Sequence, residues 1–272
     1  MTTKPVKIVA GLGLLLAPLL ATRPARATRP LFEPTDVALQ EAGSLQVDTQ
    51  LGLLRTSSRT YKNVLPDLEI DLGLMPGVEL DVDFTYAVDG PESGKLGWSS
   101  AAPDNVWSAL KLRLYSAHDE RADTSWSLVG QLGPRIPTAP DSHGLGGEAL
   151  LVFGRAWPTQ HAVLNLGAAV DPAADASNAR SAGFETGLDV DFDLDPAHHF
   201  SFLGEIGGWY GVTDRARQLH TTMGIGWQVT DALTLSASWL VGFLPDGDRY
   251  GLLIGFSPSW KLWQKPAVPP LR

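Results

Sequence analysis

The feature that most constrains this chain is a strict two-residue alternation of apolar and polar side chains, clearest between residues 77 and 88. This stretch reads G-V-E-L-D-V-D-F-T-Y-A-V, so apolar side chains alternate with Glu79, Asp81 and Asp83. Successive side chains of a strand point to opposite faces, so the stretch predicts a strand with one apolar and one acidic face. Segments of this kind recur about a dozen times, which is typical of an all-β, transmembrane antiparallel up-and-down β-barrel.

The first 27 residues have the pattern of a secretory signal peptide. Two lysines precede a run without charge from Ile8 to Leu20, and Ala25-Arg26-Ala27 forms a small-x-small cleavage site. An inner-membrane anchor is the alternative, but a run of 13 residues is shorter than the ~20 that a spanning helix needs. We therefore expect export to the bacterial outer membrane and four parts: a signal peptide at 1–27, a periplasmic N-terminal segment at 28–43, the barrel at 44–263 and a C-terminal tail at 264–272.

Composition excludes several classes of function. The net charge of −9 becomes more negative once the basic signal peptide is removed, which argues against nucleic acid as a partner. The chain has no cysteine, so it offers neither a disulfide framework nor a thiolate metal site. We expect no cofactor, and we expect outer-membrane lipid and a small-molecule solute as partners. The sequence leaves the oligomeric state open.

Segments with two-residue periodicity, bounded by turn residues, predict twelve strands, an even number as a closed bacterial barrel requires. Most are close to the ~9 to 11 residues that a tilted strand needs to cross the membrane. The count is uncertain by two. The expected strands are Ser44 to Leu53, Leu65 to Leu74, Gly77 to Val88, Val106 to Tyr115, Ser125 to Arg135, Gly146 to Trp157, His161 to Val170, Gly183 to Leu194, His199 to Tyr210, Leu219 to Val229, Leu233 to Phe243 and Tyr250 to Trp260.

The connections alternate in length. Links after the even strands are mostly tight, such as Met75-Pro76, whereas links after most odd strands are longer, such as Asp89 to Asn105. Short periplasmic turns and long external loops are what outer-membrane barrels show. Two links depart from the pattern, because Ser116 to Thr124 is long for a periplasmic turn and Leu244 to Arg249 is short for an external loop. Aromatic residues also gather near the strand ends, as the girdles at membrane interfaces require.

If the apolar face meets lipid, the other face lines the lumen with charged side chains. Strands two and three then form an acidic wall, which Lys111 and Arg113 of strand four would neutralise by cross-strand pairing. The eighth strand forms a second acidic wall whose neighbours offer His161, Asn165 and Glu205 but no strong cation. The predicted lumen-lining charges are Asp67, Glu69, Asp71, Glu79, Asp81, Asp83, Lys111, Arg113, Arg155, Glu185, Asp189, Asp191 and Glu205.

Carboxylates without a counter-charge in a confined space cost free energy unless water or a cation reaches them. This wall therefore predicts a wet lumen that favours cations. Strand six is ambiguous, and placing Arg155 in the lumen turns Leu151 and Phe153 inward as well. The remaining inward positions include apolar side chains, which suit either a hydrophobic solute or a packed interior: Val129, Val163, Leu203, Trp209, Leu240 and Leu253.

Catalytic and metal signals are weak. The stretch Gly255-Phe256-Ser257-Pro258-Ser259 only approximates the Gly-x-Ser-x-Gly nucleophile elbow. His198 and His199 are adjacent, so in a strand they would face opposite ways rather than share a metal. We therefore expect neither an enzyme nor a metal site.

Three segments resemble the outer-membrane "MetA-pathway of phenol degradation" transporter-like family. They are Asp71-Leu72-Gly73-Leu74-Met75-Pro76-Gly77-Val78-Glu79-Leu80, Phe202-Leu203-Gly204-Glu205-Ile206-Gly207-Gly208 and Trp227-Gln228-Val229-Thr230-Asp231-Ala232-Leu233-Thr234-Leu235. The resemblance implies a channel for small, often aromatic solutes and brings no catalytic residues. The hypothesis is thus a passive outer-membrane channel. The alternatives are a filled structural or interaction barrel that works through its loops and, as a third reading, a lipid-modifying enzyme.

Overall fold

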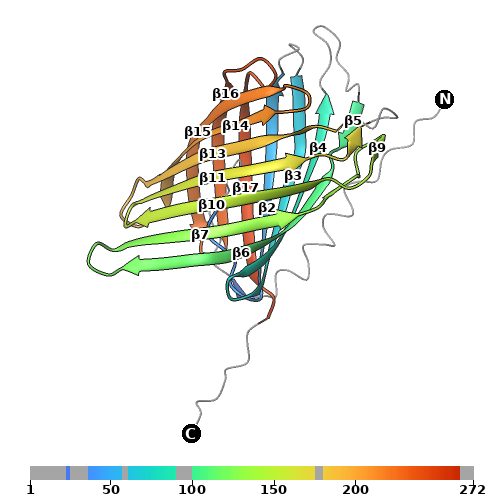
Figure 1. The fold of residues 1–272 in the computed structure, drawn as a ribbon. Helices are drawn as coiled ribbons and strands as arrows, with labels where there is room; N and C mark the ends of the chain where they lie inside the picture. Colours follow the sequence, from blue (N-terminus) through green and yellow to red (C-terminus); the bar gives the residue numbers. More distant parts are fainter. Residues whose placement is uncertain (1–22, 25–35, 57–60, 90–99, 175–179, 264–272) are drawn as a thin grey trace, which may run out of the picture.

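The computed structural model describes residues 23–24, 36–56, 61–89, 100–174 and 180–263, and it shows a closed antiparallel β-barrel (Figure 1). Twelve strands form the wall, and the described residues contain no helix. Among the described residues there is thus no helix whose length and apolar character would let it cross a membrane. The predicted signal peptide, apart from residues 23–24, and the C-terminal tail lie outside the described residues.

Each strand of the wall pairs with its neighbours in the sequence, and β17 pairs with β2 to close the ring. The wall strands are β2 (Ser44–Arg55), β3 (Tyr61–Met75), β4 (Val78–Asp89), β6 (Val106–Asp119), β7 (Thr124–Gly133), β10 (Gly147–Trp157), β11 (Gln160–Val170), β13 (Ala182–Asp193), β14 (Phe200–Gly211), β15 (Arg217–Thr230), β16 (Leu233–Gly242) and β17 (Tyr250–Lys261). The short strands are β1 (Arg23–Pro24), β5 (Ser100–Pro103), β8 (Arg135–Ile136), β9 (Ser142–His143) and β12 (Ala173–Ala174).

The twelve strands confirm the predicted count. The structure also explains the predicted link from Ser116 to Thr124, which is long for a periplasmic turn. Strand β6 continues to Asp119, so the turn to β7 comprises only residues 120–123. The Asp119 carboxylate accepts hydrogen bonds from the backbone N–H groups of Arg121 at 2.9 Å and Ala122 at 3.4 Å. A tight turn thus joins a long strand to β7, in agreement with the short periplasmic links elsewhere in the barrel.

The two faces of the wall separate by polarity as predicted. Outward apolar side chains are open to the surroundings, with Ile254 59% and Phe184 59% exposed. Inward positions are buried and many of them are polar, as on β17, where Ser257 is 0% exposed. Since the apolar band faces outward and would meet lipid, the polar face encloses the lumen.

Aromatic side chains mark both ends of the outward band. Tyr210, Phe243 and Tyr250 are exposed at the external end, and Trp227 and Trp263 at the periplasmic end. Indole and phenol rings are amphipathic and settle at membrane interfaces, so these residues fit the predicted girdles.

Strand β10 corrects one prediction, because Arg155 faces outward. Leu151 and Phe153, on the same face, are 54% and 43% exposed. The Arg155 guanidinium lies over the rings of Trp126, at 4.3 Å, and Trp157, at 4.6 Å, where cation–π attraction holds it. Both faces of β10 are apolar in sequence, and the inward face is the one that packs against Val37 of the N-terminal segment.

Candidate functional site in the barrel lumen

The predicted acidic side chains line the lumen on two walls. The first wall comprises β2, β3, β4 and β6, and the second comprises β11, β13, β14 and β15. Most are buried, including Glu79 and Asp81 at 1% exposure on the first wall and Asp189 and Glu205 at 4% on the second. The rest lie half-buried at inward positions, namely Asp67, Glu69, Asp83 and Glu185. Asp71 and Asp191 are buried as well.

Lys111 organises the first wall. Its Nζ lies 3.2 Å from a carboxylate oxygen of Asp71 and of Glu79, 3.3 Å from Asp81 and 3.4 Å from Glu69. Strand pairing explains this convergence, because Glu79 is opposite Lys111 and Asp71 is opposite Asp81. One buried ammonium group therefore forms ion pairs with four carboxylates. We call Lys111, Glu69, Asp71, Glu79 and Asp81 together the Lys111 cluster.

The Lys111 cluster is tied to its surroundings by further polar contacts. The Gln131 side-chain amide donates to Asp81 at 2.8 Å. Oxygens of Asp48, Glu69 and Asp71 lie within 4.8 Å of one another. Like charges packed this closely repel one another, and the ammonium group of Lys111 offsets part of this repulsion.

Arg113 does not join the Lys111 cluster, contrary to the prediction. Its side chain is exposed at the periplasmic mouth, and no described residue forms an ion pair with it. Its backbone N–H donates to Gly77 O at 2.9 Å, and the register of β6 against β7 shifts between Arg113 and Tyr115. The irregularity follows directly after Leu112, where the pairing of β6 with β4 ends, so Arg113 lies beyond the buried carboxylates.

The second wall has no comparable cation. Strands β11, β13 and β14 contain neither lysine nor arginine. Asp189 is directly opposite Glu205 and accepts a hydrogen bond from the Asn165 amide at 3.3 Å. His220 Nε2 lies 3.2 Å from Glu205 Oε1. The predicted neighbours of the eighth strand are thus the observed ones.

Several buried oxygens on the second wall lack a hydrogen-bond partner among the described residues. They are Asn165 Oδ1, Asp189 Oδ1 and Thr222 Oγ1, and Thr222 is opposite Glu205. A buried polar atom without a partner costs free energy of the order of 1–3 kcal/mol. Water or a solute inside the lumen would satisfy these oxygens, as it would those of Asp48 and Gln131 on and beside the first wall.

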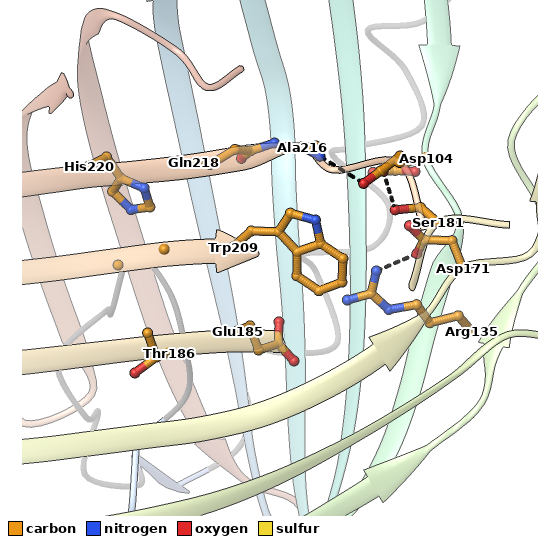
Figure 2. Close-up of a pocket in the computed structure, with 13 residues that line it drawn as sticks. Asp104, Arg135, Asp171, Ser181, Glu185, Thr186, Trp209, Ala216, Gln218 and His220 are labelled. Atoms are coloured by element: carbon orange, nitrogen blue, oxygen red, sulfur yellow. Dashed lines mark hydrogen bonds and ion pairs between the residues drawn. The ribbon is translucent and has the colours of Figure 1, made fainter. Parts of the chain in front are cut away.

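An external cavity of about 360 Å³ lies against the second wall, lined by residues of β13, β14 and β15 (Figure 2). The Trp209 side chain points into it beside Glu185, and its indole occupies space that a side chain at Gly183 would fill, since a Cβ there would lie 2.6 Å from the ring. Arg135 borders the cavity and pairs with Asp171 at 2.5 Å and with Glu148. Adjoining cavities of about 350 and 340 Å³ share Asp104 as a lining residue.

A periplasmic cavity of about 690 Å³ lies at the other end of the barrel. Residues 36–41 of the N-terminal segment line it together with His161, Asp191 and Arg113. The sequence predicts a periplasmic N-terminal segment at residues 28–43, and in the structure residues 36–43 of this segment contact the inner wall. The lumen therefore has hollow ends and a middle zone crowded by the Lys111 cluster and by apolar side chains.

Three further charged lumen residues were missed from the sequence. Asp48 alternates with Gln46 and Gln50 on β2, so its periodicity could have revealed it. Glu148 lies on the ambiguous strand β10, and Arg135 was counted as a strand end, so neither carried a clear signal. The predicted inward apolar residues Val129, Val163, Leu203, Leu240 and Leu253 are all buried in the lumen.

Comparison with known proteins shows the fold. The crystal structure of an outer membrane channel from Pseudomonas putida F1 matches with a TM-score of 0.61 at 12% identity, covering 85% of this chain and 100% of that one. This chain has the fold of an outer-membrane channel. The NanC porin structure matches with a TM-score of 0.52 at 11% identity, covering 79% of this chain and 100% of that chain.

No protein-family model and no curated protein matches the sequence. The comparisons therefore support the general class of outer-membrane channel folds. Membership of the phenol-degradation family stays a prediction.

Proposed function

We propose that this protein is a passive outer-membrane channel for small solutes and that its lumen favours cations over anions. The observation that carries the proposal is the second wall, where Asp189 and Glu205 are buried side by side on strands without lysine or arginine. A carboxylate pair of this kind attracts a mobile cation and repels an anion in a confined, low-dielectric space. Cavities at both ends provide the entrances.

Small solutes with aromatic or hydrophobic parts are the proposed cargo. Trp209 stands in the external cavity, and buried aliphatic side chains line the middle of the lumen. A partly apolar path lowers the cost of bringing a solute's hydrophobic group out of water. The likeness of the sequence to a phenol-degradation family agrees with this cargo class.

Planar bilayers with the reconstituted protein test the channel. We expect ohmic current steps and a reversal potential of cation-selective sign under a KCl gradient. The double variant Asp189→Asn/Glu205→Gln should move the reversal potential toward zero, because it removes the charge but keeps the side-chain size. Asp231→Asn, in an exposed periplasmic turn, is the matched control and should change nothing. An absence of both conductance and solute flux would refute the channel.

A filled structural barrel is the second candidate, and the crowded middle zone favours it. Val129, Val152 and Val163 are buried at 0 to 1% exposure, beside the Lys111 cluster. The same bilayer recording separates the two functions, because a filled barrel passes no current. The serines of the elbow-like stretch, Ser257 and Ser259, are buried on the lumen face, so they offer no nucleophile to lipid.

A further inference from the structure

Residues 36–43 enter the barrel and cross part of the lumen, and we call them the N-terminal strap. At one end, Gly43 N–H donates to Gly73 O at 2.7 Å, beside the start of β2. At the other end, a carboxylate oxygen of Asp36 lies 3.8 Å from His161 Nε2 on β11. On the shorter way around the ring, β4, β6, β7 and β10 lie between β3 and β11. The strap therefore spans a chord of the lumen and covers the β6–β7 side.

The side chain of Val37 fills an apolar site on the inner wall. It is 8% exposed and packs with Val129, Leu150, Val152 and Val163 from three adjacent strands. Gly154 makes the room, because a Cβ at this position would lie 2.4 Å from a Val37 methyl group. The wall therefore contains a cup that fits a small branched hydrocarbon group, and we call it the Val37 site.

Few contacts fix the rest of the strap. Gln40 N–H donates to the Glu79 carboxylate, and the Gln40 side chain donates to Gln46 at 3.2 Å. Residues 36–42 form no β-ladder with the wall, whereas each barrel strand is paired along both edges. Ala38 and Glu41 are exposed. Two apolar side chains, Val37 and the partly buried Leu39, hold the strap together with a few hydrogen bonds and an exposed ion pair between Glu41 and Lys261. Because no β-ladder adds to these contacts, the strap can leave while the barrel stays intact.

The charge next to the Val37 site selects what could replace the strap. Val163 is directly opposite Asp189 on β13, and Gly154 is directly opposite Val163 on β10. With the strap bound, Asp36 lies 3.8 Å from His161, two residues along β11 from Val163, so the strap adds a negative charge that repels the carboxylate of Asp189. A molecule with a branched alkyl or phenyl group in the cup and an ammonium group at Asp189 would replace this repulsion by attraction.

We propose that the Val37 site binds small amphipathic organic cations and that the N-terminal strap is a displaceable plug that occupies this site when they are absent. The proposal builds on the channel function, because it names a solute class and a gate for the same lumen. Solute binding and strap docking compete for the same cup. The strap also narrows the path, so its release increases flux.

A cysteine pair measures strap docking without any transport. The natural chain has no cysteine, so Val37→Cys/Gly154→Cys creates a single possible bridge. Val37 Cβ lies 3.2 Å from the position of a Cβ at residue 154, near the ~3.5–4.5 Å separation of disulfide Cβ atoms. With a mild oxidant, the pair should cross-link when the strap is docked. Solute binding is measured in Val37→Cys alone, which keeps Gly154 and therefore the cup: isopentylamine should speed labelling of the thiol by a maleimide several-fold. Ethylamine, which lacks the branched group, and isovalerate, which has the wrong charge, should not. Equal rates with all three compounds would overturn the binding site.

The same variant tests the plug in bilayers. The oxidised protein should pass several-fold less current than the same protein after reduction, and the single variants Val37→Cys and Gly154→Cys should not respond to the reductant. Gly147→Ala, on the same strand with its nearest atom at 3.6 Å, controls for substitution of a glycine. Equal current in both states would refute the plug and leave the channel standing. Silence in every state would refute the channel, whereas thiol labelling would still report the site.

Discussion

The two acidic walls of the lumen contain the same residue types, but their carboxylates have different partners. On the first wall, four carboxylates converge on Lys111, whose ammonium group is buried at 3% exposure. On the second wall, Asp189 and Glu205 face one another on strands that carry no lysine or arginine. Pairing with a lysine fixes geometry, whereas carboxylates that face one another without a lysine or arginine attract a mobile cation. Under the proposed function, the first wall supports the structure and the second wall sets the ion preference.

The largest expected effect comes from removing the cation of the first wall. Lys111→Met leaves four carboxylates together without their common partner, and breaking a buried ion pair costs about 3–5 kcal/mol. Urea unfolding of the barrel in lipid vesicles, followed by tryptophan fluorescence, measures the loss. Lys62→Met is the control, because the Lys62–Asp248 pair is partly exposed and is expected to contribute no more than about 1 kcal/mol. If both variants lose equal stability, the first wall has no special structural role.

Giving the second wall its own cation tests the other half of the comparison. Thr222 is opposite Glu205, so Thr222→Lys places an ammonium group beside the carboxylate pair and should reduce the cation-selective reversal potential by roughly half, since Coulomb attraction at this range is strong. Thr222→Met has a similar length without charge and should keep the selectivity. An unchanged potential in the lysine variant would place ion selection elsewhere in the lumen.

Neutralising one acid of the first wall should have a small effect. Glu69 is the most exposed member of the Lys111 cluster, with 29% side-chain exposure. Glu69→Gln relieves repulsion among like charges and weakens one contact to lysine, so the free energy of unfolding should change by less than about 1 kcal/mol. The reversal potential should also stay the same. A large shift in that potential would show that the first wall selects ions as well.

The smallest effect on stability is expected from a carboxylate in a turn outside the membrane, which belongs to neither acidic wall. Asp195 accepts a hydrogen bond from Phe200 N–H, and this bond together with others from the turn backbone lowers the pKa of the carboxyl. A lowered folded-state pKa stabilises the protein above the unfolded-state pKa, and this stabilisation is lost as the pH falls through the folded-state pKa. Asp195→Asn should therefore slightly flatten the acid limb of a plot of unfolding midpoint against pH. A steeper limb would contradict the assignment.

Periodicity was sufficient to predict most of the wall. Alternation along β4 and β13 placed Asp81 and Asp189 inward, because a strand in a barrel has only two faces and lipid excludes charge from one of them. The same rule failed on β10, where both faces are apolar and Arg155 alone did not show which one meets lipid. On β10 the orientation follows from packing, because Leu150 and Val152 pack against Val37 inside the barrel.

The sequence by itself determined the architecture: twelve strands, their order, the acidic lining and the place of Glu205 on the strand next to Asp189 follow from local alternation and short turns. Only the tertiary structure decided that Lys111 gathers four carboxylates, that Arg113 lies outside this group and that residues 36–43 lie inside the barrel. These outcomes depend on register and on contacts between distant segments. The strap has only eight residues and no periodicity, so its sequence does not predict which residues it contacts. Its position follows only from the three-dimensional arrangement of the barrel strands.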